Sequence, residues 1–291
     1  METKLGRKIG EGGCSEVYEY GTEQPAKIIK LAKSNTSMDA MRNEYRNHRT
    51  AWELGLPVPQ PFDLRVVDGR PGIVVEQIQG ETLMQRFLRG LDQPEVSEDC
   101  PIYDDVRMTA RILNALHSHF AEALPSQRES IKGALLGVES LTAPEKKQIC
   151  AILDDLPVKQ RLCHGDPNPG NIFVRHDEGL LIDWMNASAG NPEADLAEYI
   201  LMVRYAVLPS HLGARIIGRF HSIREMMIDA FMEEYTRLSG VTAEEVDPWM
   251  LPMAARKLSA DAISDEEKGL LLHEIRVRLN AYKGAEESFR E

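Results

Sequence analysis

Three side chains near the middle of the chain have types and spacing that suit phosphoryl transfer. The string HGDPNPGN at residues 164–171 contains Asp166 and Asn171, and IDW at residues 182–184 contains Asp183. Asp166 can accept the proton of an attacking hydroxyl group. Asn171 and Asp183 offer hard oxygen ligands that suit Mg²⁺ bridging the phosphates of a nucleotide. The pattern therefore predicts a catalytic base beside a magnesium site.

A β-hairpin is expected to position the two metal ligands. Residues 172–174 form an apolar strand, a polar turn follows at residues 176–179, and residues 180–182 return. Asn171 and Asp183 then lie at the strand ends. The alternative is that HGDPNPGN is an ordinary turn rich in Asn, Pro and Gly, of the kind that connects elements in many proteins.

A glycine-rich run near the N-terminus has the properties of a phosphate-binding turn. In IGEGGCSEVY, which starts at residue 9, the glycines are Gly10, Gly12 and Gly13. Their missing side chains allow the backbone to lie against phosphates, and Ser15 can add a hydrogen-bond donor. Hairpins also use glycine, so this run has weight only together with the other motifs.

A lysine and a glutamate complete the expected nucleotide site. Lys27, in the strand-like PAKIIK, is expected to reach the α- and β-phosphates. Residues 38–54 have the apolar periodicity of a helix, and Glu44 beside that apolar face is expected to pair with Lys27. The alternatives are a solvated strand charge for Lys27 and a generic exposed glutamate for Glu44.

A proline-rich stretch and two extended runs follow the helix. LPVPQP ends the helix, and an Asp-Gly turn joins the runs. The second run, GIVVEQIQG, ends in glycine before a helical pattern, which predicts a hinge at residues 75–80. The side chain of Val75 is expected to line the adenine slot. Backbone groups of Glu76 and Ile78 are expected to face the adenine edge.

These motifs, in this order and spacing, resemble the aminoglycoside phosphotransferase and choline kinase family, the small-molecule branch of the protein-kinase-like fold. The resemblance runs from about residue 4 to residue 205. It implies an α+β fold of two lobes, with a small antiparallel-sheet, nucleotide-binding lobe at residues 1–78. A larger, mainly helical lobe for catalysis and substrate binding would occupy residues 79–291. ATP, or GTP in its place, would be the phosphoryl donor and Mg²⁺ the cofactor.

The resemblance also implies roles for individual residues. Asp166 would be the catalytic base, Asn171 and Asp183 would hold Mg²⁺, Lys27 would contact the ATP phosphates, and Glu44 would position Lys27. Asp195, in NPEADLAEY, resembles the family's buried aspartate that braces the catalytic loop; a first-turn helix charge is the alternative. The first five groups are all present, which disfavours the alternative of a nucleotide-binding pseudokinase with a regulatory role.

Departures from protein kinases favour a small-molecule acceptor. The catalytic string is HGD rather than HRD, and Asp195 follows Asp183 by only twelve residues, which is too short for a peptide-docking platform. An aminoglycoside-like antibiotic is the first expectation, and kinases of choline, homoserine or a sugar are the alternatives. Aromatic residues are only 6% of the chain, few for the aromatic-rich pocket of a choline kinase.

Charge and hydropathy limit the partners. The net charge of −12 disfavours a nucleic-acid partner and modestly favours a cationic acceptor. The carboxylates expected to attract such an acceptor are Glu193, Glu198, Glu244, Asp261 and Glu267. The sequence contains neither an apolar signal core nor a membrane-spanning run, so a cytoplasmic monomer or homodimer is expected.

The remaining features concern structure rather than chemistry. The four cysteines, at positions 14, 100, 150 and 163, have no paired spacing, which predicts free thiols and disfavours zinc at Cys163 and His164. His117 is expected to pack beneath the catalytic loop. TAEE at 242 and SDEE at 264 predict capping boxes. The expected helices of the C-terminal part are 82–90, 103–124, 144–155, 192–207, 220–238, 242–258 and 265–283.

Overall fold

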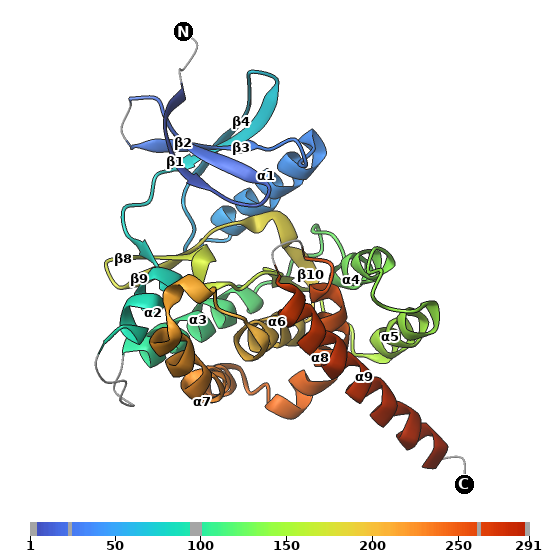
Figure 1. Ribbon diagram of the computed structural model, residues 1–291. Coiled ribbons are helices and arrows are strands. Elements are labelled where there is room, and N and C mark those ends of the chain that lie inside the picture. Colours follow the sequence, from blue (N-terminus) through green and yellow to red (C-terminus); the bar gives the residue numbers. More distant parts are fainter. Residues whose placement is uncertain (1–4, 23–24, 94–100, 261–262, 289–291) are drawn as a thin grey trace. The chain divides into compact units, whose positions relative to one another are not determined.

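The computed structural model describes residues 5–22, 25–93, 101–260 and 263–288 (Figure 1). By their internal packing they form two compact units. The first unit combines Met1–Arg86 with Pro169–Ala187, and the second combines Phe87–Asn168 with Ser188–Glu291. The sequence predicts a domain boundary near residue 78, and this boundary stays a prediction. The packing units differ from it because a later segment belongs to the first unit.

The first unit contains a five-stranded antiparallel sheet, coloured blue to cyan in Figure 1. Its strands are β1 (Leu5–Glu11), β2 (Ser15–Tyr20), β3 (Lys27–Ala32), β4 (Pro61–Val67) and β5 (Arg70–Glu76), in the spatial order β1-β2-β3-β5-β4. The predicted Asp-Gly turn joins β4 to β5. Asp68 and Gly69 both have a positive φ, 49° and 77°, which is the geometry of a tight hairpin turn.

Strand alternation divides the residues of β3 between the two faces of this sheet. Ile29 and Leu31 form a buried cluster with Val74, while Ala32 clusters with Ile73 on the opposite face. Met41 of helix α1 (Met38–Glu53) belongs to the second cluster, so α1 covers that face. The helix begins at Ser37, whose side chain accepts a hydrogen bond from Ala40 N at 3.1 Å.

The later segment of the first unit contains the predicted hairpin. Strands β8 (Ile172–Arg175) and β9 (Glu178–Leu181) pair with each other, and β8 also pairs with β6 (Glu81–Thr82). Leu181 N donates to Pro57 O at 2.9 Å, and the Asn47 side chain donates to Trp184 O at 3.1 Å. These bonds attach the segment to the N-terminal residues around it.

The second unit is mainly helical. Its helices are α3 (Pro101–His117), α4 (Gln127–Leu136), α5 (Ala143–Asp155), α6 (Pro192–Tyr205), α7 (Ala214–Ser239), α8 (Ala243–Lys257) and α9 (Asp265–Ser288), and α2 (Leu83–Leu91) leads into them. Helix α6 is the centre of this unit, since it is buried over most of its length and packs against α7 and α8 (Figure 1). A short pair of strands, β7 (Arg161–Cys163) and β10 (Ser188–Gly190), supports the loop that follows β7.

Several predicted helix boundaries need correction. The helix expected at 103–124 ends at His117, because Phe120 leaves it to bridge with Arg161. Helix α4 was not expected; only Gln127, Ile131 and Leu135 of it are buried, which gives a weak apolar stripe. Both predicted caps involve the expected residues. Glu245 Oε2 accepts from Thr242 N at 2.9 Å, and Ser264 Oγ accepts from Glu267 N at 3.1 Å.

Candidate active site

A lysine in the first unit lies between two carboxylates. Lys30 Nζ is 2.6 Å from Glu44 Oε1 and 2.9 Å from Asp183 Oδ1. Lys30 comes from β3, Glu44 from α1, and Asp183 from the end of the hairpin. The side chains of Lys30 and Glu44 are 17% and 4% exposed, whereas the Asp183 side chain is 40% exposed. One ammonium group thus connects the sheet, the helix and the hairpin.

The predicted pairing of Glu44 with Lys27 is wrong, and strand alternation explains why. Lys27 lies three residues before Lys30 on β3, so the two side chains point to opposite faces of the sheet. Glu44 belongs to α1, which covers the face of Lys30. Lys27 Nζ instead lies 4.7 Å from the ring centroid of Phe62, on the other face. The alternation in PAKIIK could have identified Lys30, had the face covered by α1 been known.

The charges of Lys30, Glu44 and Asp183 influence the pKa values of the lysine and of Glu44. Burial alone would lower the pKa of Lys30, but the carboxylates of Glu44 and Asp183 outweigh burial and raise it. Burial raises the pKa of Glu44, the nearby Asp183 adds to that rise, and Lys30 opposes it. Glu44 Oε2 is buried and accepts no hydrogen bond from the residues that the structure describes. The ion pair therefore depends on Lys30 being present and protonated.

Asn171 and Asp183 lie together at the open end of the hairpin. Ile182 N, next to Asp183, donates to Asn171 O at 2.9 Å. Asp183 has φ 65° and ψ 71°, a left-handed conformation that costs a non-glycine residue about 1–3 kcal/mol. Carboxylate and carboxamide oxygens are ligands that Mg²⁺ prefers, so this donor set fits a magnesium ion.

The glycine-rich turn connects β1 to β2. Gly12 N donates to Ser15 O at 2.9 Å, and a Cβ added to Gly12 or Gly13 would have no neighbour within 4 Å. The backbone of the turn is therefore open to a ligand. Gly10 is paired with Val17 inside the strands, and Ser15 is buried as the first residue of β2.

The expected adenine-binding residues lie at the end of β5. Val75 pairs with Ile28 and is buried on the same face of the sheet as Lys30. Glu76 Oε1 accepts from Arg175 Nη1 at 2.6 Å, which joins β5 to β8. Ile78 follows the strand and is half-buried. Their contact with adenine stays a prediction.

In the second unit, hydrogen bonds from backbone amides hold the loop that contains Asp166. Asp195 Oδ2 accepts from His164 N at 2.6 Å, and Asp195 Oδ1 accepts from Gly165 N at 2.9 Å. His164 Nδ1 lies 2.9 Å from Asp166 O, and Gly165 has φ 77°. The loop therefore holds Asp166 in a backbone conformation that depends on a glycine before it.

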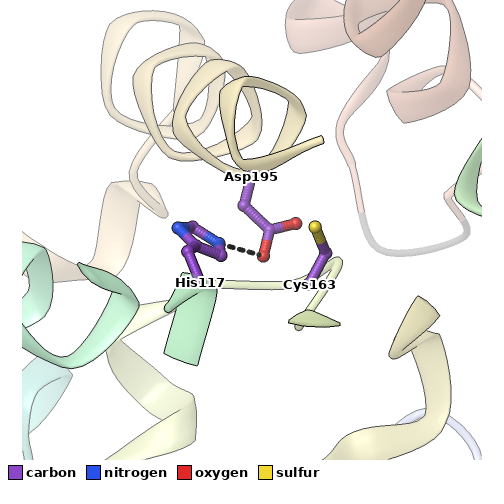
Figure 2. Close-up of side chains that lie close together, drawn as sticks. All are labelled: His117, Cys163 and Asp195. Carbon is purple, nitrogen blue, oxygen red and sulfur yellow. Dashed lines mark hydrogen bonds and ion pairs between the residues drawn. The ribbon is translucent and has the colours of Figure 1, made fainter. Parts of the chain in front are cut away.

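Asp195 is itself held by a buried histidine, as Figure 2 shows. His117 Nε2 is 3.2 Å from Asp195 Oδ2, and His117 Nδ1 is 2.7 Å from the hydroxyl of Tyr235. Burial alone would raise the pKa of Asp195, but the hydrogen bonds and charge of His117 and the His164 amide lower it. Asp195 thus lies in the first turn of α6, as the alternative required, and is also buried and bonded to the loop.

The same view contains Cys163, and the three side chains have metal-ligand types. Their ligand atoms lie within 4.8 Å of one another. Both His117 nitrogens and both Asp195 oxygens, however, already have hydrogen-bond partners. Burial raises the pKa of Cys163 well above its usual value, which keeps the thiol protonated. The cluster is better explained as a brace for the loop than as a metal centre.

The carboxylates expected to attract a cationic acceptor differ in their surroundings. Glu193 is buried and pairs with Lys159, and Glu198 is buried and pairs with Arg256 and Lys257. Glu244 is exposed at the first turn of α8, and Glu267 is buried near the start of α9. Asp261 and Cys100 lie outside the described residues, while the cysteines at 14, 150 and 163 are free. At least two of these carboxylates therefore already have internal partners.

The sequence profile of the phosphotransferase enzyme family matches residues 6–227, well over half of the chain. The chain belongs to that family. No curated protein matches the sequence of this phosphotransferase. Its predicted family and its α+β, kinase-like fold are confirmed.

Solved structures similar to this phosphotransferase have the same fold at low identity. The apo form of a thermostable mutant of aminoglycoside phosphotransferase APH(4)-Ia has a TM-score of 0.63 and 14% identity, with 94% of each chain covered. Choline kinase LicA from Streptococcus pneumoniae has a TM-score of 0.57 and 16% identity, with 95% of this chain and 93% of that chain covered. An aminoglycoside-3'-phosphotransferase of type VIII has a TM-score of 0.55 and 18% identity, with coverage of 89% and 94%.

No helix among the described residues combines the length and the apolar character that crossing a bilayer requires.

Proposed function

We propose that this phosphotransferase transfers the γ-phosphoryl group of ATP to a hydroxyl group of a small molecule. The observation that carries the proposal is Lys30, which is held between Glu44 and Asp183. A cation held in place by two carboxylates can orient phosphate oxygens without reorganising during the reaction. An ion pair with a structural role alone needs two members. Here Asp183 is a third member, and its backbone is in the left-handed conformation.

The nucleotide would be held by the first unit. Lys30 would contact the α- and β-phosphates, and the open backbone of Gly12 and Gly13 would cover the phosphates. Val75, Glu76 and Ile78 would contact adenine. A magnesium ion on Asn171 and Asp183 would neutralise charge on the phosphates.

Asp166 would act on the acceptor. Its carboxylate would orient the attacking hydroxyl group and accept its proton as the new bond to phosphorus forms. The fixed backbone of His164 and Gly165 supports this role, because a base must be held in place to align an acceptor.

The acceptor class is proposed from the chain and its structural relatives. Asp195 follows Asp183 by too few residues for a peptide-docking platform. Another structure of the thermostable APH(4)-Ia mutant, with a TM-score of 0.60 and 14% identity, is a ternary complex with ADP and hygromycin B. We therefore propose an aminoglycoside-like alcohol first, and choline, homoserine or a sugar as alternatives. A pseudokinase is disfavoured, since Lys30, Glu44, Asp166, Asn171 and Asp183 are all present.

A screen of ADP release tests the proposal. The purified protein, ATP or GTP, and Mg²⁺ are incubated with aminoglycosides, macrolides, choline and amino alcohols, and Asp166→Asn serves as the matched control. We expect acceptor-dependent ADP release that the control lowers about 10²- to 10⁴-fold while nucleotide binding persists. Nucleotide binding without ADP release for any acceptor would favour the pseudokinase. Equal rates for the control would remove Asp166 from its role.

A further inference from the structure

The connection between β3 and α1 contacts the glycine-rich turn through its backbone. Residues 33–37 form this connection, and residues 12–14 form the turn between β1 and β2. Lys33 N donates to Cys14 O at 2.9 Å. The connection also closes on itself, because Thr36 N donates to Lys33 O at 3.0 Å, as in a hydrogen-bonded β-turn. Two tight turns of the first unit thus lie against each other.

Two side chains of the connection donate to carbonyl groups of the glycine-rich turn. Asn35 Nδ2 lies 3.2 Å from Gly13 O, and Thr36 Oγ1 lies 2.9 Å from Cys14 O. A Cβ added to Gly13 would have no neighbour within 4 Å, so side-chain packing does not hold the turn at this residue. Hydrogen bonds from Asn35 and Thr36 hold it instead.

An ion pair adds to these contacts. Lys33 Nζ pairs with Glu11 at the end of β1, and Lys8 Nζ lies 2.6 Å from the same carboxylate. The hydrogen bonds from Lys33 and Lys8, together with their charges, lower the pKa of Glu11. A carboxylate beside a phosphate-binding turn would repel a nucleotide, and these two ammonium groups offset its charge.

The bonded carbonyl groups determine the direction of the neighbouring amides. In a planar trans peptide the N–H group points opposite to the C=O group. Gly13 O and Cys14 O point toward the connection, so the N–H groups of Cys14 and Ser15 point away from it. Successive backbone N–H groups on one side of a turn can bind an anion.

We propose that Asn35 and Thr36 are positioning residues for the nucleotide phosphates. They hold the glycine-rich turn with the amides of Cys14 and Ser15 directed to the phosphate oxygens. Because the turn is ordered before the nucleotide arrives, binding costs less conformational entropy than it would with a free glycine run. The inference rests on the proposed function, because it concerns the nucleotide of the same site. The alternative is that these bonds only stabilise the β1–β2 hairpin.

Nucleotide binding tests this role without any need for catalysis. Thr36→Val and Asn35→Ala each remove one donor and leave the net charge unchanged, so no charge near the phosphates is added or lost. Thr50→Val is the matched control, because the Thr50 hydroxyl donates to Arg46 O within α1 at 3.0 Å. Calorimetry measures Kd for ATP, ADP and adenosine with each protein in the presence of Mg²⁺.

The loss of affinity should depend on the phosphates of the ligand. Thr36→Val and Asn35→Ala should each raise Kd for ATP and ADP about 3- to 10-fold and leave Kd for adenosine within about twofold, as loss of one hydrogen bond to the turn predicts. Thr36→Ser keeps the hydroxyl group and should restore Kd. Thr50→Val should bind all three ligands as the wild type does.

Two results would overturn the inference and leave the proposed function standing. One is a wild-type Kd for ATP in both Thr36→Val and Asn35→Ala. The other is an equal rise of Kd for adenosine, which would mean that the bonds support the fold of the unit rather than the phosphates. A wild-type protein that binds neither ATP nor ADP would overturn the proposed function and the positioning role with it.

Discussion

At the scale of single residues, the face of β3 on which a lysine lies decides whether it can pair with Glu44. Lys27 and Lys30 have the same chemistry and lie on the same strand, yet only Lys30 lies on the face covered by α1. Glu44 was correctly expected to pair with a lysine of this strand, but Lys27 was the wrong lysine. The sequence indicates that Lys27 and Lys30 point to opposite faces of the strand, but it does not indicate which of these faces the helix covers.

The two lysines provide a matched pair for mutation. Lys30→Met should lower kcat/KM for ATP about 10²- to 10³-fold, because the phosphates lose a fixed cation and Glu44 loses its partner. Lys27→Met should leave kcat/KM little changed. Steady-state kinetics with thermal unfolding as the folding check measure both. A larger loss for Lys27→Met would return the phosphate role to that residue.

Asp183 is the residue on which metal dependence is expected to rest. Asp183→Asn replaces a charged oxygen ligand with a neutral one and should shift the Mg²⁺ titration of ADP release to higher concentration. Calorimetry of MgATP binding gives an independent measurement. Identical titrations for both proteins would contradict the assignment of Asp183 as a metal ligand.

At the scale of elements, the hairpins and most helices follow from local signals, while their contacts do not. The Asp-Gly turn, the β8–β9 hairpin and the caps at Thr242 and Ser264 were all expected from short strings. Helix α4 was missed because its apolar stripe is weak and its stability comes from packing.

Helices α3 and α7 are joined by an ion cluster that predicts a pH dependence. Glu234 of α7 accepts from Arg237 and from Arg111 of α3, and these guanidinium groups lower its pKa from 4.5 to about 2. A lowered folded-state pKa contributes stability that is fully present above pH 4.5 and is lost as pH falls toward 2. The difference in unfolding free energy between wild type and Glu234→Gln should therefore shrink below pH 4.5. Urea unfolding across this range measures it, and a difference that is constant with pH would contradict the prediction.

At the scale of the whole molecule, the sequence gives the net charge directly but does not indicate where the charged side chains lie. The net charge of −12 needs no structure. Its distribution does, because Glu193 and Glu198 were expected to attract a cationic acceptor and are instead paired with internal cations. Any attraction of a cation must then come from the field of the remaining carboxylates.

That field predicts a salt dependence for a cationic acceptor. Raising ionic strength above about 0.15 M shortens the screening length below about 8 Å, so KM for the acceptor should rise while kcat stays nearly constant. An uncharged acceptor from the same screen is the control and should show little change. A best acceptor that is uncharged, with KM insensitive to salt, would defeat the cationic-acceptor proposal and leave the phosphotransferase assignment intact.

The placement of Pro169–Ala187 in the first unit has a consequence for synthesis on the ribosome. Met1–Arg86 emerges first, but the hairpin that completes its packing is translated only after Phe87–Asn168. At about 5–20 residues per second, the nascent sheet waits for several seconds with the Pro57 carbonyl and the Asn47 side chain lacking their later partners. The N-terminal segment therefore cannot reach its final packing alone, and a fragment cut after Arg86 lacks the hairpin and the Asp183 that follows it. Folding of the first unit is in this way coupled to translation of Pro169–Ala187.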